Sequence, residues 1–257
     1  MRAIFRLTIL GMLLTAIGAS AQGVKTSTPD ITTIVSRMQT EMADLNHDLA
    51  YSVTREYTLT PENARNSDRV VAQVNTVASG KKDYTITQGS GQAESVVRKV
   101  LDHEADASVG HTNGALSPAN YAFALLGTET VDGHACYVIG LTPRHDSKDV
   151  LRGKAWVDSE SYLIRQIAGS PAKSPSWWIK DVQITLHYRD IQGVWVQDST
   201  KAVAQVRIVG KHTLASRAVD VRTNSVIAAK SDLQKASTRR KRRVDPAMLG
   251  AGVFQHR

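Results

Sequence analysis

The chain has 257 residues, of which 42% are hydrophobic, so it is long enough for one large β domain or two small ones with a substantial core. Its formal net charge is +8, but the charge sits at the two ends: residues 1–21 contribute +2 and residues 230–257 contribute +6. Because the body between them is neutral, the composition argues against a nucleic-acid-binding domain.

The N-terminal segment has the pattern of a secretory signal peptide. Arg2 and Arg6 precede an apolar run over residues 7–17, and small residues follow it. This run is much shorter than the roughly 20 residues that span a bilayer, so it predicts cleavage near Ala21 rather than a membrane anchor. The residue directly after Ala21 is not a cysteine, so we expect no lipid attachment at the cleavage position. The sequence thus predicts a soluble bacterial protein that is exported to the periplasm and begins near Gln22.

The first element of the mature chain is predicted to be an amphipathic helix that begins at Thr28 and Pro29, with Thr28 as its N-cap. Its apolar positions recur at helical spacing, and the opposite face is polar. The apolar stripe comprises Ile31, Ile34, Val35, Met38, Met42, Leu45 and Leu49. Such a helix either covers an adaptable apolar surface, for which methionine is suited, or completes an ordinary core.

From residue 51 the hydrophobic period changes to two, which is typical of strands. A second helix is predicted at 93–104, followed by a mobile loop at 105–116 and a short helical turn over 119–125. The second half reads as consecutive hairpins joined by turns such as Asp132-Gly133. The predicted strands are 51–59, 69–78, 83–88, 127–132, 134–142, 151–157, 162–168, 177–188, 194–207 and 213–222.

Consecutive hairpins form an antiparallel meander, so the fold class is mainly β (α+β). A sheet of about ten strands curls strongly, and its inner apolar face is then too wide for its own side chains to fill. We therefore expect a curved antiparallel sheet, an open half-barrel whose concave face is closed by a helical lid. This domain is predicted to span residues 22–228, and a basic disordered tail is predicted at 229–257.

Two features would suit contact with a membrane. The run Arg239–Arg243 in the tail either touches an anionic membrane surface or is simply solvated. Trp177 and Trp178 open a predicted strand, so one ring should face the core and the other the rim or solvent. A rim tryptophan beside Lys173 and Lys180 would suit a lipid headgroup, although plain packing also accounts for the pair.

We identify no residue set that predicts catalysis, a metal site or a bound cofactor. His103 and Glu104 are neighbours on a predicted helix, where adjacent side chains diverge by about 100°, so they indicate a solvated helix end. Ser170 and Lys173 match a Ser-x-x-Lys pattern, but an intervening proline opposes the helix that this chemistry requires. Cys136, the single cysteine, lies in a predicted strand and indicates a buried, inert thiol. We therefore interpret the chain as non-enzymatic.

The segment 152–158 reads Arg-Gly-Lys-Ala-Trp-Val-Asp, and Tyr-Leu-Ile-Arg-Gln-Ile follows at 162–167. This pair resembles the central hairpin of the LolA/LolB-like outer-membrane lipoprotein-sorting superfamily, in which a G-x-x-W-V-D strand turns into a strand with an apolar-Arg pair. Residues 127–143 and the order of the parts are also similar to those proteins. The resemblance covers residues 30–225. It implies a half-barrel with a helical lid that binds acyl chains between them, either to carry lipoproteins or to sense them.

The sequence departs from the superfamily in two respects. The lid-locking Arg-Pro pair of the carrier LolA has no clear counterpart, since the nearest position reads Lys81-Lys82-Asp83. The segment Pro171–Trp178 and the basic tail also lack an obvious equivalent. The resemblance therefore implies the fold more strongly than it implies the carrier role.

The sequence thus predicts a monomeric, non-catalytic protein that shelters acyl chains as a carrier or chaperone in outer-membrane lipoprotein sorting. Burial of each methylene contributes about 0.8 kcal/mol, so binding needs no charged contact. The alternatives are an envelope-stress sensor or protein-interaction module on the same fold and, with less support, an envelope hydrolase. The predicted lipid-binding residues are Ile34, Met38 and Met42 on the lid, with Trp156, Trp178 and Ile184 on the sheet.

Overall fold

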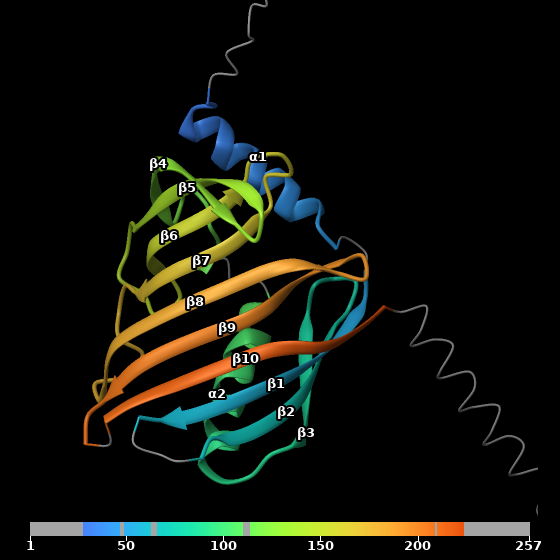
Figure 1. The fold of residues 1–257 in the computed structure, drawn as a ribbon, viewed down its shortest axis with the longest axis vertical. Coiled ribbons are helices and arrows are strands. Elements are labelled where there is room, and N and C mark those ends of the chain that lie inside the picture. The colour runs from blue at the N-terminus through green and yellow to red at the C-terminus, as the bar shows by residue number, and fades with distance from the viewer. Residues whose placement is uncertain (1–27, 47–48, 63–65, 110–113, 209, 224–257) are drawn as a thin grey trace, which may run out of the picture.

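The structure is a computed structural model that describes residues 28–46, 49–62, 66–109, 114–208 and 210–223. These residues form one ten-stranded antiparallel sheet and two helices (Figure 1). The predicted signal peptide at 1–21 and the basic tail at 229–257, with its run Arg239–Arg243, lie outside the described residues. Within the described residues, no helix combines the length and apolarity that crossing a membrane requires.

The sheet is an open meander to which the N-terminal strands are added. The helices are α1 (Ile31–Asp44) and α2 (Gly91–Ala107). The strands are β1 (Tyr51–Pro61), β2 (Asp68–Thr76), β3 (Lys82–Gln88), β4 (Tyr121–Val131), β5 (His134–Pro143), β6 (Leu151–Asp158), β7 (Ile164–Pro171), β8 (Ile179–Ile191), β9 (Val194–Val206) and β10 (Gly210–Thr223). Their order is β3-β2-β1-β10-β9-β8-β7-β6-β5-β4, so β1 joins the meander by pairing with β10. Because β3 and β4 remain at opposite edges, the predicted open half-barrel is confirmed.

Helix α1 begins later than its sequence signals suggest. Asp30, not Thr28, is the N-cap, because its carboxylate accepts hydrogen bonds from the Thr33 backbone N–H (3.0 Å) and from the Thr33 hydroxyl (2.8 Å). The apolar stripe is unaffected by this correction, since Ile34 and Met38 are fully buried.

Residues 119–125, predicted as a helical turn, instead lead into strand β4. Tyr121, Phe123 and Leu125 all pack toward one hydrophobic core, and β4 pairs with β5 along its whole length. Helical propensity over so short a segment is a weak signal, and the long-range ladder overrides it. The second predicted helix is confirmed as α2 and is longer at both ends.

Both helices lie on the same face of the sheet. Paired residues of an antiparallel sheet point to the same side, so a cross-strand row identifies one face. One such row comprises Ile167, Leu186, Thr200, Ser216, Tyr57 and Val70. Ile167 belongs to the core beneath α1, whereas Tyr57 and Val70 belong to the core beneath α2. In Figure 1, α2 is visible behind β10 and β1.

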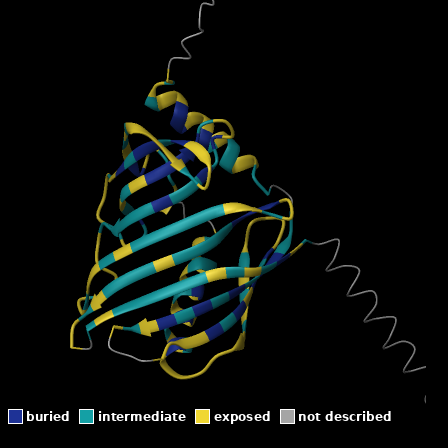
Figure 2. Ribbon diagram, in the orientation of Figure 1, coloured by how far each residue is buried: buried dark blue, intermediate teal, exposed yellow. Residues whose placement is uncertain are grey.

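Each helix closes a hydrophobic core of its own. Helix α1 packs on β4 to β7, where Ile34 and Met38 meet residues such as Val157. Helix α2 packs on β1 to β3 through Val97 and Leu101. The strands between these two cores, β8 to β10, are mainly of intermediate burial over their length (Figure 2).

Candidate functional site

The inner face of β8, β9 and β10 lies between the two helix-covered cores. Its side chains are aliphatic or small, and each is half-buried. We call this surface the central strip; it comprises Ile184, Leu186, Thr200, Ala202, Leu214 and Ser216. The principal helix contacts are of α1 with β4 and of α2 with β1, β2 and β3, so the helices flank the strip. Leu186 borders the α1 core and Leu214 borders the α2 core.

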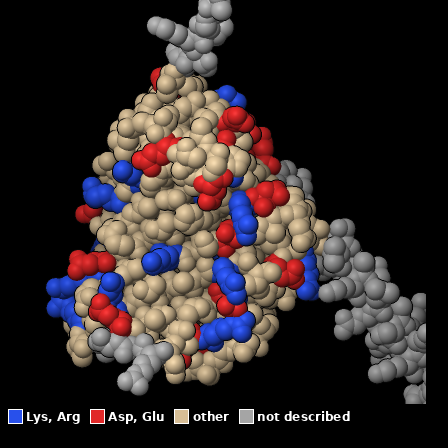
Figure 3. Space-filling model, in the orientation of Figure 1, with Lys and Arg blue, Asp and Glu red and all other residues tan. Residues whose placement is uncertain are grey.

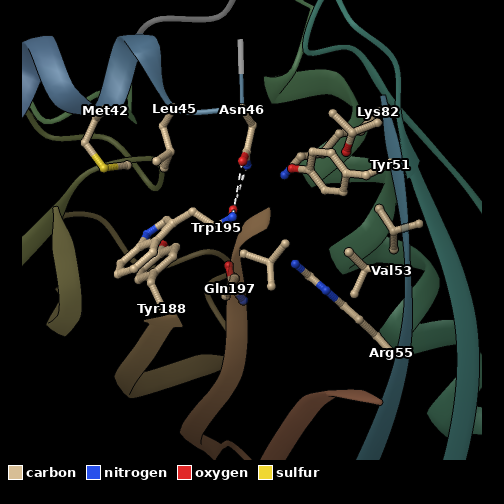
Figure 4. Close-up of a pocket in the computed structure, with 13 residues that line it drawn as sticks. Met42, Leu45, Asn46, Tyr51, Val53, Arg55, Lys82, Tyr188, Trp195 and Gln197 are labelled. Carbon is tan, nitrogen blue, oxygen red and sulfur yellow. Dashed lines mark hydrogen bonds between the residues drawn. The ribbon is translucent and has the colours of Figure 1, made fainter. Parts of the chain in front are cut away.

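A cavity of about 230 Å³ adjoins the strip, where the end of α1 approaches β1 to β3 and β8 to β9 (Figure 4). Tyr188, two residues beyond Leu186 on β8, is part of its wall. The lining residues are Met42, Leu45, Asn46, Tyr51, Val53, Arg55, Val74, Thr76, Lys82, Tyr188, Trp195, Val196 and Gln197. Small-molecule sites usually enclose about 300–1,000 Å³. The cavity is therefore suited to one end of an extended ligand rather than to a whole lipid.

A buried charge pair stands at the cavity. Arg55 is only 5% exposed, and its Nη1 donates to both carboxylate oxygens of Glu104 on α2, at 3.3 and 3.2 Å. Figure 4 shows its guanidinium reaching from β1 toward the wall formed by Gln197. Burial disfavours the charged guanidinium and is the largest single influence, but the Glu104 carboxylate together with Tyr57 and Tyr188 outweighs it, and the pKa of Arg55 is raised. The pair thus ties α2 to the sheet with the cation held fully charged.

Two tyrosines lie close to this charge pair and stay neutral. Burial raises the pKa of Tyr57 to about 12, with the Arg55 charge acting in the opposite direction. Burial also raises the pKa of Tyr188 to about 12. Both hydroxyls therefore remain protonated at neutral pH and do not act as bases.

The end of α1 is fastened to β9 at the edge of the cavity. The Asn46 side-chain amide donates to the Trp195 carbonyl at 2.7 Å and its oxygen accepts from the Trp195 N–H at 3.2 Å. Trp195 is 8% exposed, and the Arg165 guanidinium carbon lies 5.2 Å from the centroid of its ring. These contacts hold the cavity wall in one arrangement.

Asp102, His103 and Glu104 on α2 are of residue types that bind metals, but each contacts a different partner. Asp102 accepts a hydrogen bond from Tyr84, His103 Nε2 lies 3.4 Å from Asp149, and Glu104 binds Arg55. Glu104 is therefore not part of a solvated helix end, which corrects the sequence interpretation. Over the described part of the chain, no three His, Cys, Asp or Glu side chains are grouped as metal ligands.

The predicted lid residues occupy two environments. Ile34 and Met38 pack fully buried in the α1 core, against the sheet. Met42, one turn further along α1, is half-buried and lines the cavity. On the sheet, Ile184 lies in the central strip. The structure thus places Met42 in the wall of the cavity and Ile184 in the strip beside it.

The other two predicted residues lie elsewhere. Trp156 is on the opposite face of β6, packed with Cys136 and Val138, and its indole N–H donates to Glu129 at 2.7 Å. Its strand neighbours Ala155 and Val157 face α1, which follows from the two-residue period of a strand. Trp177 and Trp178 precede β8, so the expectation that they alternate across a strand is wrong, and Trp178 is 40% exposed.

The sequence interpretation missed the charge pair and Trp195. One signal was present. Arg55 is the single charged residue in an alternating series of buried or half-buried positions, whose other members are Tyr51, Val53, Tyr57 and Leu59. A charge on the core face of a strand requires a buried partner. Its partner Glu104 is 49 residues away, and nothing in the local sequence identifies it.

Comparison with known proteins finds the following similarities. A family model described as "-like: Uncharacterized protein" matches residues 105–225, which is under half of the chain. No curated protein matches the sequence. A solved structure of a DUF1329 family protein from Desulfovibrio piger is 13% identical, with a TM-score of 0.45 over 77% of this chain and 94% of its own.

Two further solved structures are similar. A domain described as an outer membrane lipoprotein-sorting protein, from Vibrio parahaemolyticus, is 13% identical, with a TM-score of 0.41 over 74% of this chain and 92% of its own. A LolA superfamily protein from Nitrosomonas europaea is 12% identical, with a TM-score of 0.38 over 76% and 94% of the two chains. The chain is thus similar to these proteins at low sequence identity.

Proposed function

We propose that this protein is a periplasmic, non-catalytic binder of acyl chains that carries or chaperones a lipid or lipoprotein in outer-membrane lipoprotein sorting. The observation that carries the proposal is the central strip. It presents aliphatic and small side chains on the concave face, half-exposed between two helix-covered cores. A strip of this kind, which ends on β8 two residues from the cavity wall at Tyr188, suits an extended hydrocarbon chain.

The chemistry of the cavity supports binding in place of catalysis. Its lining contains no Ser, Cys, His, Asp or Glu among the described residues. Arg55, Lys82 and the protonated Tyr188, with Asn46, Thr76 and Gln197, supply polar groups among the apolar walls of the cavity. These groups suit the oxygen atoms at the polar end of an amphiphile whose chain lies on the central strip.

The free energy of such binding comes from apolar burial. About ten methylenes removed from water contribute about 8 kcal/mol, before the cost of immobilising the ligand is subtracted. A single acyl chain therefore binds reversibly, and two chains bind tightly, which is the range that a carrier requires.

Native mass spectrometry of the chain from Gln22 onward, purified after export, tests the proposal. We expect an added mass that matches a lipid, and we expect Ile184→Glu and Met42→Glu each to reduce its occupancy at least tenfold, because a charge in the apolar site disfavours the hydrocarbon. Thr185→Glu is the matched control, since it introduces the same charge on the opposite face of β8. A wild-type protein that carries no lipid and takes up none from vesicles would contradict the proposal.

A further inference from the structure

Two loops form a common tip at one end of the central strands. The β7–β8 loop and the β9–β10 connection meet where Ile179 pairs with Val206. The Arg207 backbone N–H donates to the Trp178 carbonyl at 2.8 Å, so the loops are held side by side. Within the first loop, the Ser174 hydroxyl bonds to the Ile179 carbonyl at 2.5 Å. We call this surface the tip; it comprises Lys173–Lys180 together with Arg207 and Ile208.

Large apolar side chains of the tip stand in solvent. Trp177 is 79% exposed, Trp178 is 40% exposed, and Ile208 is fully exposed at 103%. Single exposed apolar residues are ordinary, but here three large ones lie on two adjoining loops. Ile208 also has a φ of +79°, a conformation that is costly for a β-branched residue. Ile208 thus stands in solvent in a strained backbone conformation.

Cations surround these apolar side chains. Lys173, Lys180 and Arg207 are exposed, and Lys211 follows on β10. The Arg207 guanidinium lies 5.9 Å from the centre of the Trp177 ring. In the sequence, no acidic residue occurs within 173–180 or 206–211.

Acidic residues adjoin the tip but do not lie within its segments. Asp181 follows Lys180, and Glu62 donates its backbone N–H to the Lys211 carbonyl at 2.9 Å. The Lys173 backbone N–H donates to the Ser147 carbonyl at 3.2 Å, so the loop with Asp146, Lys148 and Asp149 also adjoins the tip. Five cations against four carboxylates leave a net positive surface. In Figure 3, Lys and Arg side chains are visible, with some acidic ones, at the lower left, where Figure 1 places the loops that join β7 to β8 and β9 to β10.

We propose that the tip docks on the surface of an anionic phospholipid bilayer. Tryptophan favours the depth of the headgroups, where its ring is apolar and its N–H is wet, and isoleucine favours the acyl region below. Lysine and arginine around them meet the phosphates of the headgroups. The tip therefore matches a bilayer in both its apolar centre and its charged rim. This inference goes beyond the proposed function, because it holds whether or not the central strip binds an acyl chain.

The test is binding of the chain from Gln22 onward to vesicles of phosphatidylglycerol and phosphatidylethanolamine, measured by co-sedimentation. We expect the double variant Trp177→Ser/Ile208→Ser to lower the partition coefficient by about 30-fold or more, because two buried apolar side chains are lost. Lys173→Gln and Lys180→Gln should each lower it by about fivefold at low salt. The matched control is Val219→Ser, which removes an exposed valine on β10 about 30 Å from the tip.

Tryptophan quenching by lipids brominated on their acyl chains separates insertion of the tip from adsorption of the basic tail. If the tip docks, brominated vesicles quench the fluorescence of the wild type, and Trp177→Phe removes a large part of that quenching. Vesicle binding that is unquenched and indifferent to the tip variants would overturn the proposal in favour of the tail. Failure of the wild type to bind the anionic vesicles at all would overturn it too. Neither result bears on whether lipid co-purifies with the protein, which tests the proposed function separately.

Discussion

The buried pair of Arg55 and Glu104 gives the sharpest test of how the helix-covered half of the sheet is held. We expect Glu104→Met to destabilise the protein strongly, because it leaves the guanidinium, 6% exposed in its side chain, without its carboxylate. At 3.2 Å and an effective dielectric constant of about 20, the attraction between the two charges is about 5 kcal/mol. The Glu104 side chain is 23% exposed, so solvent screening reduces the expected loss to about 3 kcal/mol.

A double-mutant cycle measures this coupling. The assay is urea unfolding followed by circular dichroism for the wild type, Arg55→Met, Glu104→Met and the double variant. We expect the double variant to recover about 2 kcal/mol relative to the sum of the single changes, since the unpaired charge is then absent. In thermal unfolding, Glu104→Met should lower Tm by about 10 °C.

The matched control is Arg98→Met, which breaks the exposed pair between Arg98 and Glu94 on the same helix. Their side chains are 51% and 29% exposed, so we expect a change below about 0.5 kcal/mol. The reasoning would be refuted if Glu104→Met cost no more than this control, or if the two changes at Arg55 and Glu104 were simply additive.

Two further predictions concern the β6–β7 hairpin. The Asp158 carboxylate is buried, which opposes its charge, but the Ser161 N–H and the Arg165 guanidinium outweigh burial and hold its pKa below the usual 3.8. The stability it contributes is therefore present above about pH 4 and is lost as the pH falls through the lowered pKa; acid titration of unfolding should show this loss in the wild type and not in Asp158→Asn. Gly153→Ala should destabilise by about 3 kcal/mol or more, because a Cβ there would overlap the Ala168 carbonyl and lie 2.6 Å from the Gly169 Cα; chemical denaturation measures the loss.

Controls on neighbouring residues test these two explanations. Glu160→Gln removes an adjacent carboxylate and should leave the acid dependence of the wild type in place. Lys154→Ala, next to Gly153 and exposed, should change the free energy of unfolding by less than about 0.5 kcal/mol. An acid profile of Asp158→Asn identical to that of the wild type, or a Gly153→Ala protein of normal stability, would contradict the respective account.

The hairpin also explains why its sequence pattern was informative. Gly153 pairs with Gly169 where β6 and β7 approach too closely for side chains, and Asp158 caps the turn by accepting from the backbone N–H groups of Glu160 (2.9 Å) and Ser161 (3.0 Å). The close approach restricts the residue type at position 153, and the turn restricts it at position 158. A short motif therefore identified this part of the fold correctly, although Trp156 within it faces away from the helices.

The sequence by itself determined most of the elements and the fold class. Alternation of period two, turn pairs such as Asp132-Gly133 and the stripe on α1 are local signals, and the structure confirms the strands and the open, helix-covered sheet. The helical turn predicted at 119–125 and the Thr28 cap were wrong because competing local signals were of similar strength, and a ladder or a single side-chain bond decided between them.

Only the tertiary structure decided what lies between the helices. The pairing of β1 with β10, the contact of Arg55 with Glu104, and the meeting of Trp178 with Arg207 each join segments that are far apart in the chain. Sequence periodicity reports which face of a strand is apolar, but not which strands become neighbours or where a helix stops covering them. The sequence pointed to parts of these surfaces, namely Ile184 and the tryptophan pair beside Lys173 and Lys180. The long-range contacts decided the rest: which residues complete the central strip, and that Arg207 and Ile208 join the tip.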